Sequence, residues 1–120
     1  MNGHVDPIGR ALVGISIRKW DAESFREIQA WIDTGFNGDL VLPRAQIQDL
    51  QLPPSGTVKA ILADGSEVSL QRYRCLIDWF GAELDLEVVS REGEYPLLGV
   101  GLLLGHELQI SYRSGAVTIQ

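Results

Sequence analysis

The chain has a single cysteine, Cys75, and only two histidines among its 120 residues. One cysteine excludes an internal disulfide and is consistent with a reducing compartment. The histidines, His4 and His106, lie far apart in the sequence, and no potential metal ligands have metal-site spacing on one element. We therefore expect no metal and no other cofactor.

Basic residues are also scarce, since 10 Lys and Arg stand against 16 Asp and Glu, for a net charge of -6. This balance lacks the basic footprint of a nucleic-acid-binding protein and disfavours anionic membrane surfaces. The longest apolar run, residues 97–105, is too short to span a bilayer, and the N-terminus does not read as a signal peptide. We expect no nucleic-acid partner, no membrane partner and a cytoplasmic location.

What is present fits a globular domain. Apolar residues make up 45% of the chain and charged residues 22%, which is typical of a folded protein and not of a disordered one. A length of 120 residues allows one core, so residues 1–120 are expected to form a single domain.

Alternation of apolar and polar residues predicts strands over residues 13–17, 28–33 and 83–88. Asp64-Gly65 and Ser114-Gly115 each stand between two such runs and predict hairpins. The apolar face changes phase within residues 67–80, which a bulge or a strong twist near Gln71 would allow.

Two short segments are the best helix candidates. Residues 43–50 begin with proline at a plausible first helical position, and residues 100–107 have room for one turn. The chain is therefore expected to be all-β, with seven or eight strands and little helix.

The stretch AWIDTGFNGDLVLP, residues 30–43, places Asp33 between two apolar runs. Asp33 either forms a turn in Asp-Thr-Gly or performs chemistry at a strand end. A lone carboxylate cannot easily hydrolyse an amide without a second acid–base group. The chain has no second Asp-Thr-Gly or Asp-Ser-Gly, but a second copy across a two-fold axis could supply one.

Other candidate sites are weaker. Gly99 to Gly105 has the wrong spacing for a dinucleotide loop and lacks a βαβ context. Cys75 falls on the apolar face of a predicted strand, so we expect a buried structural thiol.

Three segments in order, IDTGFNGDLVLP, ILADGS and YPLLGVGLLLGHELQIS, resemble the retropepsin-like (clan AA) aspartic proteases, and most closely the small single-domain bacterial members. The resemblance covers roughly residues 13–119. It implies a closed β-barrel with a ψ-shaped core, a flap hairpin and one or two short helices. It also implies a homodimer, in which the terminal strand AVTIQ could join the interface.

The resemblance assigns roles residue by residue. Asp33 is the expected catalytic residue, Thr34 braces the two loops across the dimer axis, and Gly35 lets backbone and substrate approach. Leu98 and Gly99 support the catalytic loop. The expected flap and pocket residues are Phe36, Leu62, Ala63, Asp64, Gly65 and Ser66.

The implied reaction is peptide-bond hydrolysis without a metal. In the implied homodimer the two Asp33 carboxyl groups lie side by side and share one proton. Activity should therefore peak at acidic to mildly acidic pH. Three departures concern substrate preference, flap mobility and efficiency. Phe36 replaces the small residue usual in viral and pepsin-like members, although Asp-Thr-Gly-Phe is a familiar variant in the small bacterial ones. The flap tip ADGS has fewer glycines than the viral flap, and Gly101 replaces a frequent polar residue. The alternatives are a catalytically weak dimer that binds a peptide or protein, and an unrelated small β-barrel.

Overall fold

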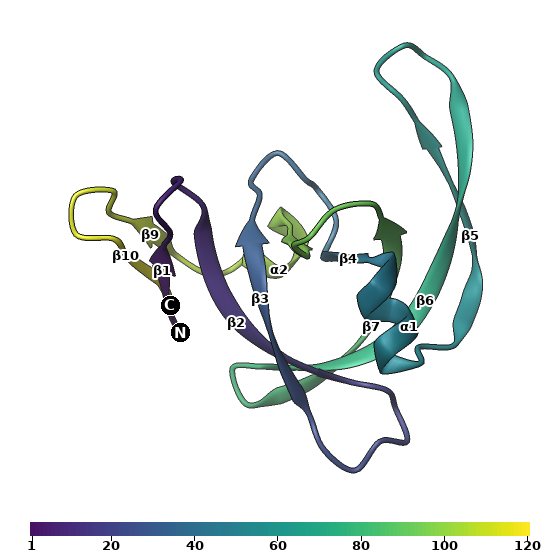
Figure 1. Ribbon diagram of the computed structural model, residues 1–120, viewed down its shortest axis with the longest axis horizontal. Coiled ribbons are helices and arrows are strands. Elements are labelled where there is room, and N and C mark those ends of the chain that lie inside the picture. Colours follow the sequence, from purple (N-terminus) through teal and green to yellow (C-terminus); the bar gives the residue numbers. More distant parts are fainter.

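The computed structural model describes residues 1–120 and contains ten strands and two short helices (Figure 1). The mostly β fold predicted from the alternation is confirmed. The elements are β1 (Asn2–Val5), β2 (Ala11–Arg18), β3 (Arg26–Ile32), β4 (Leu40–Pro43), α1 (Arg44–Leu50), β5 (Pro54–Ile61), β6 (Glu67–Trp79), β7 (Ala82–Arg91), β8 (Leu97–Leu98), α2 (Val100–Leu103), β9 (Leu108–Ile110) and β10 (Ala116–Ile119).

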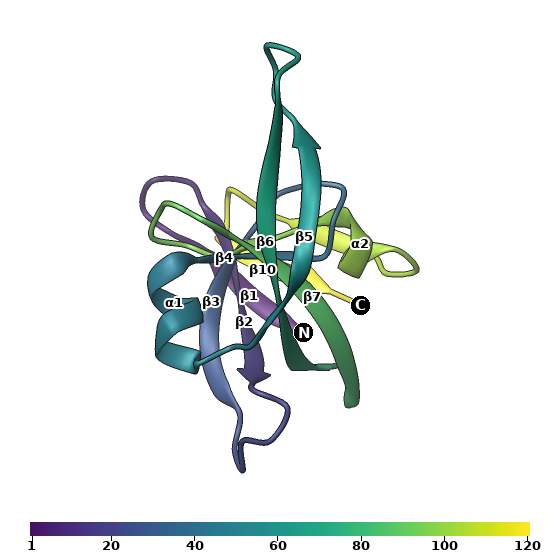
Figure 2. The same ribbon diagram turned by 90° about the vertical axis from the view of Figure 1, so that its right-hand side faces the viewer.

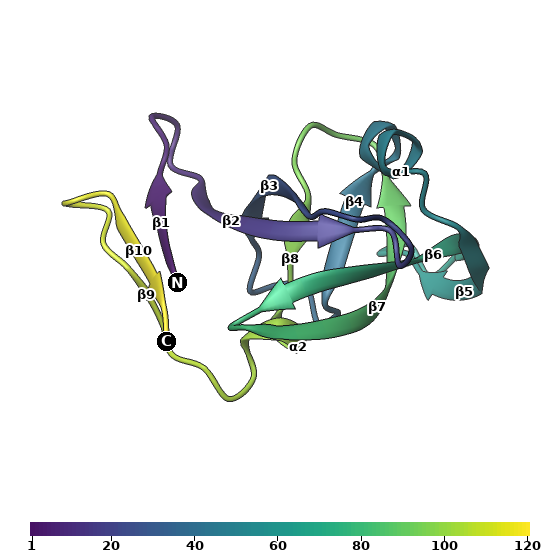
Figure 3. The same cartoon turned by 90° about the horizontal axis from the view of Figure 1, so that it is seen from below.

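Strand pairing forms a circuit of six strands. The ladder runs from β6 through β7, β4, β8, β3 and β2, and β2 pairs again with β6. Figure 3 shows these strands arranged around a common centre. The count of seven or eight strands was too low, because β1, β8 and β9 are only two to four residues long and depend on distant partners that no local pattern reveals.

The core is one cluster of 20 buried residues, most of them on the strands of this circuit, and no polar or charged residue is buried. Val13, Ile15 and Ile17 on alternate positions of β2 are at most 1% exposed, as the period-two pattern predicts. Cys75 and Ile77 of the neighbouring strand β6 also have no exposed surface, and Ile77 is paired in register with Ile17. The buried thiol expected at Cys75 is confirmed, and burial raises its pKa to about 12.

The centre of the fold has the crossed shape that gives a ψ-loop its name. The short β8 lies between β3 and β4, with Ile32 and Leu40 both paired to Leu98. Pairing with β3 is parallel and pairing with β4 is antiparallel. The loop of residues 33–39, which joins β3 to β4, therefore passes directly over the end of β8.

Strand β6 belongs to two parts of the molecule. Its residues 72–79 pair with β7, whereas residues 67–71 pair only with β5. The β5–β6 hairpin, called the flap hairpin below, projects away from the rest of the chain (Figure 2). The register shift lies in β5 between Pro54 and Gly56, so the change of phase near Gln71 occurs without an extra residue in β6.

The two ends of the chain lie together at one edge of the ten-stranded sheet, which they join through the pairing of β1 with β2. β10 pairs with β1 on one side and with β9 on the other. Both of its edges are thus occupied within one chain. The pairing within the chain does not involve a partner, so the part of AVTIQ in a dimer interface stays a prediction.

The helices are short and lie close to their predicted positions. α1 begins at Arg44, and Pro43 is its N-cap residue and not its first helical residue. α1 ends at Leu50, and its C-cap residue, Gln51, has the left-handed conformation with φ 55°. α2 occupies four of the eight residues 100–107. Neither helix is long and apolar enough to cross a membrane.

Candidate functional site

Asp33 is the first residue after β3, and its backbone is fixed by the neighbouring strand. Its N–H donates to the carbonyl of Leu98 at 2.9 Å, which extends the β3–β8 ladder by one residue. The preceding side chain, Ile32, is buried in the core. Because side chains alternate along a strand, Asp33 points away from the core and is half-buried.

The Asp-Thr-Gly segment forms a tight turn around the carboxylate. Gly35 N–H donates to Oδ1 of Asp33 at 2.9 Å, and Phe36 N–H donates to its backbone carbonyl at 3.2 Å. The turn-forming interpretation of Asp33 is therefore satisfied by Oδ1 alone. Oδ2 of Asp33 and the hydroxyl of the exposed Thr34 form no hydrogen bond within the chain.

Gly99 lies directly beneath this loop. Its N–H donates to the carbonyl of Asp39 at 2.9 Å, and the next N–H, of Val100, donates to the carbonyl of Phe36 at 2.8 Å. A Cβ at Gly99 would lie 2.1 Å from the carbonyl oxygen of Gly38, a distance that no side chain tolerates. The close approach of two backbones explains why glycine is needed here.

A similar lack of space explains the glycine at position 101, where the family often has a polar residue. A Cβ at this position would lie 2.2 Å from Oδ1 of Asp39 and 3.0 Å from the carbonyl oxygen of Gly38. The N–H of Gly101 also donates to that carbonyl at 3.0 Å. A polar side chain at position 101 is thus incompatible with Asp39 as it lies here.

The large ring of Phe36 is accommodated by the same glycines. Its Cζ lies 2.5 Å from the place a Cβ of Gly38 would take, and its Cδ2 lies 2.5 Å from that of Gly99. The ring is half-buried and lines a hollow of about 510 Å³ together with Val41 and Leu70. Phe36 therefore packs across two glycines and also borders open space beside the loop.

Another hollow, of about 350 Å³, contains Asp33 itself. Its other lining residues are Trp31, Ile32, Arg91 and Leu97. Trp31 is 40% exposed, although it lies in a strand next to the core. Sequence reasoning did not single out this set, and the available signal was a tryptophan on the otherwise polar face of β3, two residues before Asp33.

Trp31 is held in place by a cation from the β1–β2 turn. The guanidinium of Arg10 lies 5.9 Å from the centroid of the Trp31 ring and 4.3 Å from that of Tyr95. Asp6 fixes this guanidinium through an ion pair of 2.5 Å. The ion pair and the stacking together position the aromatic wall of the hollow at Asp33.

The expected flap residues form an ordered turn that stands apart from Asp33. Gly65, with φ 85°, allows the chain to reverse between β5 and β6. Ser66 donates to Oδ1 of Asp64 through both its N–H at 2.9 Å and its hydroxyl at 2.6 Å. These hydrogen bonds hold the pKa of the Asp64 carboxyl below its usual value. No residue of 62–66 lines the hollow that contains Asp33.

The structure thus brings together the Asp-Thr-Gly turn, Phe36, Leu98 and Gly99, and leaves the flap tip separate. No protein-family model matches the chain, and no curated protein matches it in sequence. Its structure matches that of a retropepsin-like aspartic protease from Rickettsia conorii with a TM-score of 0.65, over 99% of this chain and 88% of that one, at 17% identity. The chain has the retropepsin-like fold. The protease of Simian Foamy Virus (mac) also aligns, at 19% identity over 73% of this chain and 88% of that one, but its TM-score of 0.49 is too low to support the assignment.

In this chain, the loop of residues 33–39 places one carboxylate, that of Asp33, in the hollow described above. The second acidic residue of that loop, Asp39, approaches Gly101 and does not line the hollow at Asp33. One chain therefore offers a single acid–base group at this position, and chemistry that needs two requires a second chain.

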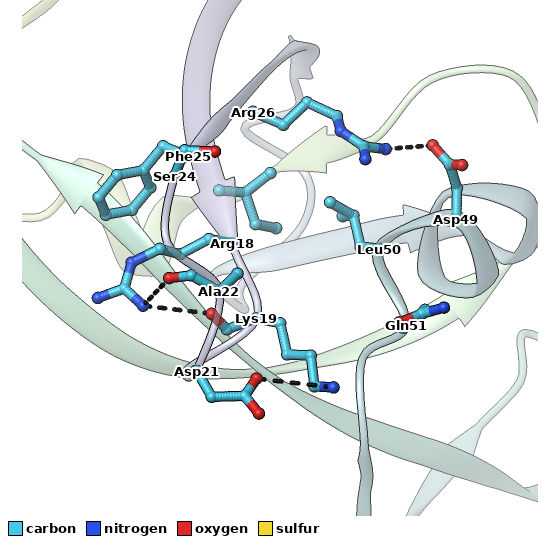
Figure 4. A pocket seen from close by; sticks show the side chains of 11 residues that line it. Arg18, Lys19, Asp21, Ala22, Ser24, Phe25, Arg26, Asp49, Leu50 and Gln51 are labelled. Carbon is cyan, nitrogen blue, oxygen red and sulfur yellow. Dashed lines mark hydrogen bonds and ion pairs between the residues drawn. The ribbon is translucent and has the colours of Figure 1, made fainter.

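A further hollow, of about 540 Å³, lies at the opposite end of β3 (Figure 4). Its cations are neutralised by their own surroundings. Arg18 donates to the carbonyls of Trp20 and Ala22, at 2.7 and 3.1 Å. Lys19 pairs with Asp21 and Arg26 pairs with Asp49, as Figure 4 shows. At the Asp33 end, by contrast, Oδ2 of Asp33 and the hydroxyl of Thr34 have no partner within the chain.

Proposed function

We propose that the protein is an aspartic endopeptidase whose active site forms when two copies of the chain bring their Asp33 carboxylates together. One observation carries this proposal: in a retropepsin-like fold, the turn leaves Oδ2 of Asp33 and the hydroxyl of Thr34 without partners in the chain. Polar groups of a protein interface normally find hydrogen-bond partners. A second copy related by a two-fold axis supplies the same groups in return.

The proposed chemistry follows from placing two like charges side by side. The pair holds one proton, because ionising both carboxyl groups at close range is unfavourable. The ionised member polarises a water molecule, which attacks the carbonyl carbon of the peptide bond. The protonated member donates a hydrogen bond to the carbonyl oxygen and later helps to protonate the leaving amine. Activity is expected to peak at acidic to mildly acidic pH, and the titration belongs to the pair.

The remaining residues have supporting roles in this proposal. Thr34 donates a hydrogen bond across the axis and braces the two loops, while Gly35 leaves room for substrate backbone. Leu98 and Gly99 hold the loop from below. The flap tip, Leu62–Ser66, closes over the peptide, and the substrate pairs with backbone like an added strand.

A second candidate function is a retropepsin-like dimer that binds a peptide without cutting it. The observation that favours it is the bulk of Phe36, whose ring packs across Gly38 and Gly99 and takes up space next to the loop. In that case the hollows at Asp33 hold an extended peptide, but the water needed for hydrolysis is not positioned.

Cleavage of a mixed peptide library, read by mass spectrometry from about pH 3.5 to about pH 7.5, tests the first function. We expect wild type to cut and Asp33→Asn to lose at least about 10²–10⁴-fold in rate. Asp21→Asn is the matched control, because Asp21 is exposed and lies at the far end of β3. Equal cutting by all three proteins contradicts a catalytic Asp33.

The oligomeric state separates the two functions from an unrelated role. Sedimentation at rising protein concentration is expected to show a dimer. A folded dimer that cuts nothing favours the peptide-binding function. A monomer at every concentration and at every pH of the assay contradicts both, because the groups at Asp33 are then never completed.

A further inference from the structure

The charged groups that line the hollow at Asp33 include one cation without an ion pair. Of the ten Lys and Arg residues, seven form ion pairs with carboxylates. The other three are Lys59, Arg91 and Arg113. Lys59 lies on β5 and Arg113 in the β9–β10 turn, and neither lines a described hollow. Arg91 lines both the hollow that contains Asp33 and the one beside Phe36.

The position of Arg91 is set by the central strands. It is the last residue of β7, paired in register with Pro43 at the end of β4. Its Nε–H donates to the carbonyl of Glu92 at 2.9 Å, which fixes one edge of the guanidinium. Nη2 lies only 3.1 Å from the place a Cβ of Gly93 would take, so a glycine leaves room for the group to lie flat. Both Nη groups have no acceptor within the chain.

The rest of the hollow is apolar and suits the stem of a side chain. Trp31 and Leu97 provide the walls, and the hollow measures about 350 Å³, within the usual range of small binding sites. Arg91 stands at its boundary with the neighbouring hollow. A side chain that enters beside Asp33 therefore meets apolar surface first and a free guanidinium second.

An exposed guanidinium edge with two Nη donors matches the two oxygens of a carboxylate. We propose that Arg91 selects peptide substrates with an acidic side chain, best a glutamate, at a position next to the cleaved bond. The glutamate methylenes would pack on Trp31 and Leu97, and its carboxylate would bind the two Nη groups. This inference rests on the proposed peptidase function.

The surrounding charges confine the preference to this position. Glu92, the nearest acidic residue in sequence, pairs with Arg44 at 3.7 Å. Glu94 acts on Arg10, whose pKa is raised chiefly by its hydrogen bond to Asp6 and to a smaller degree by Glu94. The chain as a whole carries a net charge of -6 and repels acidic peptides elsewhere. An acidic residue in a substrate is thus expected to interact favourably with the protein only where it reaches Arg91.

Two short peptide libraries test the inference, identical except that one has glutamate and the other glutamine at the central positions. We expect wild type to cut the glutamate library about fivefold to tenfold faster at low salt. The preference should shrink in high salt, because the pair is partly exposed. Arg91→Gln should remove it, and Arg91→Glu should favour a matching lysine library. Arg113→Gln is the control, since Arg113 is also unpaired and borders no described hollow.

Binding separates this inference from the proposed function. The same libraries, labelled with a fluorophore, are titrated with Asp33→Asn alone and with Asp33→Asn combined with Arg91→Gln. If wild type cuts nothing but the first variant binds the glutamate library more tightly than the second does, the peptidase proposal fails and the role of Arg91 stands. Equal use of glutamate and glutamine by wild type, or a preference that survives in Arg91→Gln, overturns the inference while leaving the peptidase proposal in place.

Discussion

Replacing Gly99 with alanine is the sharpest test of how the central loop is held. The added Cβ would lie 2.1 Å from the carbonyl oxygen of Gly38 and 2.7 Å from that of Phe36. Both oxygens are backbone atoms that already accept hydrogen bonds, from Gly101 and Val100. The contact can be relieved only by moving the loop away from α2, which breaks those bonds and displaces the carboxylate of Asp33.

Overpacking of this kind costs about 1–3 kcal/mol of unfolding free energy, and contacts with backbone place Gly99→Ala at the upper end. We expect the midpoint of urea unfolding to fall by about 1 M or more with an unchanged slope. Peptide cleavage should fall further than the loss of folded protein explains, because Asp33 moves with the loop.

Gly14→Ala provides the matched control for Gly99→Ala. Its Cβ would meet Oε1 of Glu27 at 3.0 Å, the end of a flexible side chain that can turn away. We expect the unfolding free energy to stay within about 1 kcal/mol of wild type. Alanine contributes some stability here, because it lowers the conformational entropy of the unfolded chain. If Gly99→Ala unfolds at the wild-type urea concentration, or if both variants lose equally, the close approach at Gly99 is not what holds the loop.

Two further predictions concern titratable groups. Burial raises the pKa of Cys75 to about 12. Because the thiol ionises at lower pH in the unfolded chain, the free energy of unfolding should fall as pH rises above about 9. A thiol reagent at about pH 8 should label Cys75 only as fast as the protein unfolds. Cys75→Val should flatten that alkaline limb. Arg74 bonds Asp85 and holds its pKa below the usual value, so this pair stabilises the fold above about pH 4 and the benefit is lost as pH falls further. Asp85→Asn should make acid unfolding less steep there, and an unchanged acid limb would contradict this.

Local pattern was sufficient for the long strands and insufficient for the short ones. β2, β6 and β7 follow from alternation, because β2 buries every second side chain and β6 and β7 do so over part of their length. The hairpin at Asp64-Gly65 follows from its turn residues. β8 has two residues and exists only because β3 and β4 lie on either side of it, so no window of sequence around it carries that information.

The candidate site divides in the same way. Asp33, Leu98 and Gly99 could be found from sequence, since ordered motifs carry them and the fold brings them together. Trp31 and Arg91 were missed, because their hollow is assembled from the ends of three strands that meet through non-local pairing. The catalytic roles, the homodimer and the cytoplasmic location stay predictions.

The division of β6 between the core and the flap hairpin implies that its two halves differ in local stability. Residues 67–71 have hydrogen-bonded neighbours on one side only, and nearly every residue of β5 is exposed. A two-stranded ribbon without a core is marginally stable alone, so its amides should exchange with solvent long before those of residues 72–79. In the proposed function, a peptide that the flap covers must therefore supply the free energy of ordering it. Under that proposal, stiffening the ribbon raises peptide affinity without adding a single contact.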